Sequence, residues 1–147
     1  TWYYQLSENY LCEPVQHYGF YLTPLQNFEK GKTVFYPHGY SNYFFHPTHP
    51  HELIIVSTEN NKVSILNCLS GEIVRTISKG KEYAFCNIDP VTGNYLFRNS
   101  YYVLITNENG DELFRMRSED ASPYLANNIL TCWAGAAINV EPYLKKP

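Results

Sequence analysis

Short runs of apolar residues, separated by turn-forming residues, follow one another through the middle of the chain. Residues 53–56 form a continuous apolar run of strand length, as expected for a strand that is buried on both faces. Apolar and polar residues alternate in part over Ile73–Ile77, which is the period of a strand with one buried face. No stretch of ten residues in this region has the i, i+3, i+4 spacing of an amphipathic helix. The pattern therefore predicts an all-β region.

The expected strands of this region fall into two groups that are bounded by turn residues. The first group is residues 42–45, 53–56, 63–66 and 73–77, and the second is residues 83–88, 95–98, 101–106 and 113–116. Pro47 and Pro50 force a turn inside the first group, because each fixes φ and lacks a donor N–H. In the second group the pair Asn109–Gly110 is a strong hairpin signal.

The ends of the chain are less regular. We expect strands over residues 2–6, 19–23 and 33–36, with breaks at residues 13–14 and 23–24. Towards the other end, residues 124–131 are expected as one strand. Residues 133–140 are expected as a second strand, with a short helix as the alternative. Residues 141–142 and 145–147 are expected to be a frayed end.

The two central groups repeat one another at a nearly constant distance. The spacing is 40 residues for Ile65–Ile105 and for Asn67–Asn107, 43 for Pro47–Pro90, and 39 for Gly71–Gly110. A repeat of about 40 residues with four antiparallel strands is typical of a propeller blade. We expect the clearest repeats at residues 40–79 and 80–118.

The first repeat resembles a WD40 repeat. Residues 38–47 (HGYSNYFFHP) stand where such repeats have a Gly-His pair, a strand and a closing Pro, and residues 53–61 (LIIVSTENN) resemble the second strand and its turn. The Trp-Asp positions hold Leu66–Asn67 and Thr106–Asn107. This resemblance implies an all-β fold of antiparallel four-stranded blades of a β-propeller.

The length of the chain limits how many blades it can contain. Closed propellers have about 4–8 blades. At about 40 residues a blade, 147 residues supply three to four. Because an open stack leaves strand edges and apolar faces uncovered, we expect residues 1–147 to be one segment of a larger propeller. The missing blades would come from further polypeptide, from another copy or from a partner subunit.

Composition and charge narrow the partners. The 14 Tyr, 8 Phe and 2 Trp favour β structure and supply rings that bind proteins when they are exposed. The net charge is −3 and no basic block is present, so direct nucleic-acid binding is not expected. No apolar run is long enough for a membrane helix and no signal peptide is evident. Four separate cysteines (Cys12, Cys68, Cys86 and Cys132) allow two disulfides, but we favour thiols in an intracellular protein, in the cytoplasm or nucleus.

Four histidines are the main candidates for chemistry. His38, His46, His49 and His51 lie within 14 residues, and Glu52 follows. Imidazole and carboxylate are zinc ligands, but this spacing matches no zinc pattern, so two Pro-fixed turns at a blade rim are the preferred interpretation. We expect no metal and no cofactor.

No nucleophile elbow, phosphate-binding loop or dinucleotide-binding motif is present, so we expect a protein that is not an enzyme. The leading hypothesis is a non-catalytic protein-interaction scaffold within a multiprotein complex. Its partner-binding residues are expected to be Tyr40, Tyr43, His46, His49, His51, Lys79 and Lys81. One alternative is a self-contained β-module that binds carbohydrate or another ligand through aromatic rings. A second alternative is a metal-dependent hydrolase that uses the four histidines.

Overall fold

The computed structural model describes residues 4–15, 17–25, 32–39, 41–118, 122–132 and 135–146. Almost all regular structure in these residues is antiparallel β-sheet, as the sequence predicts. The chain divides into two compact units, Thr1–Thr76 and Ile77–Pro147, and each is described here by itself.

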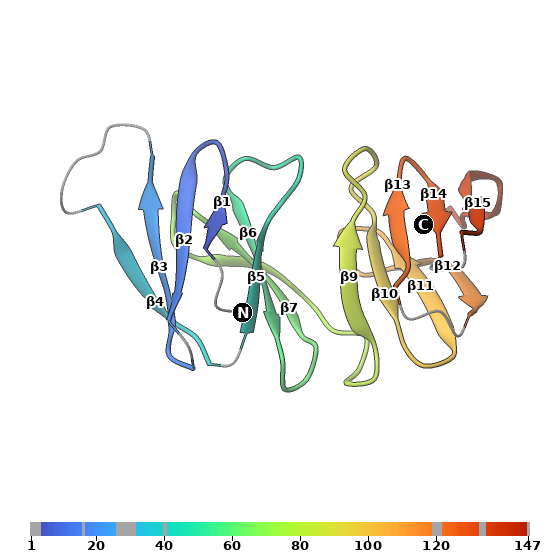
Figure 1. Cartoon of the computed structure of the whole chain (residues 1–147), viewed down its shortest axis with the longest axis horizontal. Coiled ribbons are helices and arrows are strands. Elements are labelled where there is room, and N and C mark those ends of the chain that lie inside the picture. The colour runs from blue at the N-terminus through green and yellow to red at the C-terminus, as the bar shows by residue number, and fades with distance from the viewer. Residues whose placement is uncertain are drawn as a thin grey trace. The chain divides into compact units, whose positions relative to one another are not determined.

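The first unit contains two antiparallel meanders, in which each strand pairs with the next one along the chain (Figure 1). The first sheet consists of β1 (Gln5–Leu6), β2 (Tyr10–Val15), β3 (Gly19–Pro24) and β4 (Val34–Pro37). The second sheet consists of β5 (Ser41–Phe45), β6 (Glu52–Ser57), β7 (Val63–Asn67) and β8 (Ile73–Ile77), which ends at the first residue of the second unit.

The second unit repeats this plan. The third sheet consists of β9 (Ala84–Ile88), β10 (Tyr95–Arg98), β11 (Tyr102–Thr106) and β12 (Glu112–Arg117). The fourth sheet has three strands among the described residues, β13 (Tyr124–Ala126), β14 (Ile129–Thr131) and β15 (Ala137–Asn139). A short 3₁₀ helix, η1 (Glu141–Tyr143), follows β15. The prediction of four-stranded antiparallel blades is confirmed.

Equivalent asparagines close equivalent turns in the second and third sheets. Between β7 and β8 the Asn67 Oδ1 accepts the backbone N–H groups of Leu69 and Ser70 at 2.9 and 3.1 Å. Between β11 and β12 the Asn107 Oδ1 accepts those of Asn109 and Asp111, both at 3.0 Å. These are the two positions that the sequence places 40 residues apart. An amide oxygen therefore holds the turn at the positions that resemble Trp-Asp.

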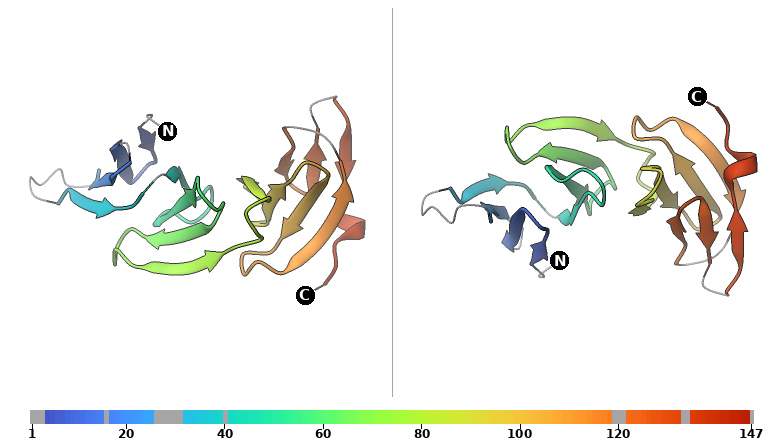
Figure 2. Two further views of the ribbon diagram at one scale, coloured as in Figure 1. Left: turned by 90° about the horizontal axis from the view of Figure 1, so that it is seen from below. Right: turned by 90° about the horizontal axis from the view of Figure 1, so that it is seen from above.

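Each unit has its own apolar core between its two sheets, which are seen from two further directions in Figure 2. In the first unit β2 and β3 contribute one side of the core and β5, β6 and β7 the other. Its buried residues are Tyr10, Cys12, Phe20, Leu22, Tyr43, Leu53, Ile55 and Leu66. In the second unit the buried residues are Leu96, Val103, Ile105, Leu125, Leu130 and Val140.

The structure contradicts three of the sequence predictions for the two ends of the chain. The predicted break at residues 13–14 is wrong, because β2 continues through Pro14, which lies opposite Phe20 of β3. The predicted single strand at residues 124–131 is wrong too. Asn127 and Asn128 have φ of 50° and 60° and turn the chain into the β13–β14 hairpin. Glu141 and Pro142 belong to η1 and are not a frayed end.

Candidate functional site

The turn after the first strand of three sheets begins with a side chain that accepts backbone N–H groups two and three residues further on. In the first sheet the Ser7 Oγ accepts from Asn9 and Tyr10 at 3.3 and 3.0 Å. In the second sheet the acceptor is the Nδ1 of His46, and in the third it is the Oδ1 of Asp89. Serine, histidine and aspartate thus play the same structural role.

His46 is buried and makes its side-chain hydrogen bonds within its own turn. Its Nδ1 accepts the N–H groups of Thr48 and His49, both at 3.1 Å, and its ring stacks on the His49 ring at 4.0 Å between centroids. Because Nδ1 accepts, the neutral ring carries its proton on Nε2, which is buried and has no hydrogen-bond partner among the described residues. Burial, together with His49 and Arg75, lowers the pKa of His46 to about 4, against the opposing effect of Glu52.

A small ionic network lies beside this ring. The Nδ1 of His49 is 3.0 Å from Glu52 Oε2, and Arg75 Nη2 of β8 donates to Glu52 Oε1 at 2.6 Å. Burial by itself raises the pKa of Glu52, but the hydrogen bonds from His49 and Arg75 outweigh it, so the pKa lies below its ordinary value. The network ties the turn before β6 to the outer strand of the same sheet.

The same residues are the closest approach to a metal site among the described residues. Potential ligand atoms of His46, His49 and Glu52 lie within 4.8 Å of one another. However, the two imidazole planes differ by only 17°, so their in-plane lone pairs run side by side and do not converge on one point. The His46 Nδ1 already accepts two N–H groups, and Glu52 is paired with Arg75. This geometry is that of a capped turn beside an ion pair.

The other two histidines of the predicted group lie elsewhere. His38 stacks on Phe20 at 5.8 Å between ring centroids, and burial lowers its pKa. The Nδ1 of His51 is 2.8 Å from the Tyr10 hydroxyl. The hydrolase hypothesis needs the four histidines at one centre, and the structure does not bring them together.

Two of the predicted partner-binding residues are not on the surface. Tyr43 is 2% exposed and packs against Phe20 at 4.7 Å between ring centroids, so its expected role as a surface ring is wrong. His46, 6% exposed, is corrected for the same reason. Both were predicted at the surface because turn and strand positions do not reveal burial. Tyr40 lies outside the described residues.

The remaining predicted residues are more accessible. His49 and His51 are half-buried at the turn between β5 and β6. In the second unit, Lys81 is exposed, while Lys79 is half-buried and its Nζ donates to the Gly110 carbonyl at 2.8 Å. Beside His49, a pocket of about 190 Å³ opens between the Ser7 and His46 turns. It is large enough for one side chain of a partner.

Sequence reasoning missed Asp89, which makes the most connected polar site in the second unit. Its carboxylate is fully buried and accepts four backbone N–H groups, from Val91, Thr92, Asn127 and Asn128, at 2.9, 3.3, 2.8 and 2.9 Å. The last two belong to the β13–β14 turn. Burial raises the pKa of Asp89, but these N–H donors outweigh it and hold the pKa below its ordinary value.

Asn87, which lies in β9 two residues before Asp89, reinforces this connection. Its Oδ1 accepts the Leu125 N–H at 3.1 Å and its Nδ2 donates to the Leu125 carbonyl at 2.9 Å. Asn87 of β9 therefore holds β13, and Asp89, directly after β9, holds the turn that follows β13. The sequence did contain a signal for this site, because Asp89 directly precedes Pro90 just as His46 directly precedes Pro47.

The cysteines are free thiols in the structure. Burial raises the pKa of Cys12 and of Cys68 to about 12 and that of Cys86 to about 11. Such thiols carry almost no thiolate at neutral pH and behave as small apolar side chains.

In the described part of the chain no helix is long and apolar enough to span a membrane.

Comparisons with known proteins agree with this architecture. No protein-family model and no curated protein sequence matches the chain. Among solved structures, BamB from Moraxella catarrhalis matches 88% of the chain and 38% of its own length, with a TM-score of 0.62 and 16% identity. The WD40 domain of Toxoplasma gondii coronin matches 88% of the chain and 39% of its own length, with a TM-score of 0.65 and 13% identity.

A third structure, the β-propeller domain of Myceliophteria thermophila Cps50 (Swd1), matches 88% of the chain and 47% of its own length, with a TM-score of 0.60 and 11% identity. The chain has the fold of an incomplete β-propeller. Its sheets are therefore propeller blades. The chain spans less than half the length of these three propeller structures. At these identities the likeness concerns the fold alone.

Proposed function

We propose that the chain is a non-catalytic protein-interaction scaffold and one segment of a larger propeller. The observation that carries the proposal is a set of exposed apolar side chains on the outer face of the first blade, beside the polar residues Glu13 and Thr23. The three propeller structures named above support a binding platform, and each of these three is more than twice as long as the part of it that this chain matches.

Strand register identifies this face. Cys12, Phe20 and Leu22 point into the core of the first unit. Side chains alternate along a strand, so the residues between them point to the opposite face. Leu11 pairs with Leu6, and Tyr21 pairs with Phe35. These two pairs lie on the outer face of the first blade.

Apolar side chains on the outer face are partly buried but remain accessible to solvent. Leu6, Tyr21 and Phe35 are 71%, 43% and 41% exposed. The rings of Tyr21 and Phe35 contact each other at 5.0 Å between centroids, so they form a small apolar surface on adjacent strands. Within each unit the blades bury such faces against one another. The occupant with the best fit is therefore another blade, provided by further polypeptide or by a partner subunit.

The rim beside His49 is the proposed second contact. Pro47 and Pro50 are exposed there and fix the shape of the turn, and His49 is partly accessible at the pocket. Lys81 and Tyr40 stay in the proposal as partner-binding residues. His51 would act by supporting the turn through its contact with Tyr10.

The mass of the folded chain in solution tests this proposal. We expect the isolated chain to self-associate, and the double variant Tyr21→Ser/Phe35→Ser to be monodisperse, in sedimentation velocity experiments. The matched control is Tyr18→Ser/Tyr101→Ser, which removes two rings that are 71% and 55% exposed at other places and should leave self-association unchanged. A wild-type chain that is a folded, monodisperse monomer with no bound partner would instead favour the self-contained ligand-binding module.

A further inference from the structure

The fourth blade has an open edge. Three of the four sheets have four strands, and β4, β8 and β12 are the fourth strands. The sheet β13–β14–β15 ends at β15 among the described residues. It therefore lacks the strand that occupies the outer position in the other three.

The alternation of hydrogen bonds along β15 shows which of its backbone N–H and C=O groups face this edge. The Ala136 carbonyl accepts from Cys132 N–H, and the Val140 N–H donates to the Asn128 carbonyl, both at 2.9 Å. In an antiparallel pair every second residue of a strand faces the same neighbour, so Ile138, between them, also faces β14. The N–H and C=O groups of Ala137 and Asn139 consequently point away from β14, to the open edge.

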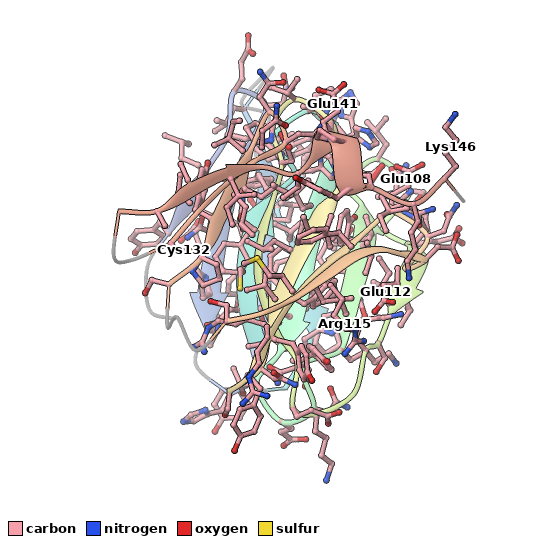
Figure 3. All side chains as sticks on the ribbon, turned by 90° about the vertical axis from the view of Figure 1, so that its right-hand side faces the viewer. Glu108, Glu112, Arg115, Cys132, Glu141 and Lys146 are labelled. Carbon is pink, nitrogen blue, oxygen red and sulfur yellow. The ribbon has the colours of Figure 1, made fainter. Side chains whose placement is uncertain are left out.

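The described continuation of the chain does not fill this position. After η1, Leu144 packs against the core of the second unit, and the Lys145 N–H donates to the Leu113 carbonyl at 2.8 Å. The chain thus turns to β12, on which Glu112 and Arg115 lie in Figure 3, with Glu141 on η1. The side chains of Ala137 and Asn139 are exposed and short, so these two residues themselves leave room for a strand at their backbone.

We propose that the open edge of β15 binds an extended segment of a partner polypeptide, which adds in antiparallel orientation as the fourth strand. An unpaired edge with short or exposed side chains is the surface on which strand addition occurs. Main-chain hydrogen bonds to Ala137 and Asn139 supply the affinity, and the side chains of the added strand supply the specificity.

The third blade predicts the chemistry of that segment. On its fourth strand Phe114 and Met116 lie opposite Ile105 and Val103 and pack against the core, while Arg115 and Arg117 alternate with them. In the fourth blade Ile138 packs against the same core as a partly buried residue. The residue opposite Ile138 is therefore apolar and its neighbours are polar. Glu141, exposed just after β15, favours a basic residue at that end.

A peptide titration tests the edge. The probe is a fluorescein-labelled hexapeptide with the sequence of Glu112–Arg117, added to the full chain and followed by fluorescence anisotropy and by hydrogen exchange. We expect saturable binding and slower exchange of the Ala137 and Asn139 amides, which exchange quickly in the free chain. Two versions of the peptide, each N-methylated at every second amide, should behave differently. Methylation of the amides that face β15 should abolish binding, and methylation of the other amides should leave it intact.

Two substitutions at one residue separate strand addition from other binding. Ala137→Pro removes an N–H that faces the open edge and should weaken peptide binding at least tenfold, with an unchanged far-ultraviolet circular dichroism spectrum. Ala137→Val keeps that N–H and should bind the peptide as the wild type does. The proposal fails if the peptide does not bind, if Ala137→Pro binds it equally well, or if both amides are protected in the free chain. If the Ala137 and Asn139 amides become protected while the mass of the chain doubles, the strand that binds β15 comes from a second copy of the chain and not from a partner.

Discussion

His46→Asn should remove the part of the acid sensitivity of the first unit that comes from its buried imidazole. Asparagine keeps an oxygen that can accept the Thr48 and His49 N–H groups, as Asn67 and Asn107 do for their own turns. It does not titrate. The substitution therefore separates the cap, which is retained, from the imidazole, which is buried without a partner for Nε2 among the described residues.

The magnitude follows from the pKa of His46, which burial lowers from 6.5 to about 4. Between these values the unfolded chain binds the proton and the folded chain does not, so the stability present above pH 6.5 is lost as the pH falls towards 4. At about 1.4 kcal/mol per pH unit, the loss from this one group is about 3 kcal/mol. His49, Glu52 and Arg75 face His46 and are unchanged in the variant.

Urea denaturation at a series of pH values from 7 to 4 measures this difference. We expect the wild type to lose about 3 kcal/mol more than His46→Asn over that range. The two proteins should differ little at pH 7, where both turns are capped. Parallel stability curves would refute the argument, because they would mean that His46 is protonated in the folded chain or solvated. A large loss for His46→Asn at pH 7 would show that the amide does not replace the imidazole as a cap.

Two further substitutions test the core and the link between blades. Tyr43→Ala should destabilise the chain by about 3–5 kcal/mol in urea denaturation, as for other large-to-small core substitutions, whereas an exposed binding residue would cost little. Asp89→Ala removes the acceptor for four backbone N–H groups and should cost about 4 kcal/mol, with faster hydrogen exchange at Asn127 and Asn128. Unchanged exchange at these two amides would show that the carboxylate does not hold the β13–β14 turn.

The sequence predicted the blade architecture well because the repeated turns have clear local signals. The bounds of β8 and β10 agree with the prediction, and Asn109–Gly110 closes the expected hairpin. The errors arose where a local rule was overridden. Pro14 is tolerated within β2 although proline usually ends a strand. The Asn127–Asn128 turn was overlooked because apolar residues flank it on both sides, which made one long strand plausible.

The candidate site was harder to predict, because burial is a property of packing between strands that are distant in sequence. Nothing local shows that Tyr43 packs against Phe20, or that His46 is 94% buried while His49 is not. The alternation that made Tyr21 and Phe35 neighbours on one face depends on register, which is known only once the strands are paired. Site residues that depend on register therefore require the structure.

The three capped turns explain how the blade layout can be kept while the residues at these positions differ. The turn requires only an acceptor at its first residue, and Ser7, His46 and Asp89 all provide one. Selection for the fold alone thus permits these residues to differ, which is consistent with identities of 16% or less to the three solved propellers described above. Asp89 is exceptional because it has a second oxygen, which reaches the Asn128 N–H of the next blade. The Asp89 Oδ1 caps its own turn and also accepts the Asn127 N–H, so both oxygens hold the neighbouring hairpin and Asp89 is the least replaceable of the three residues.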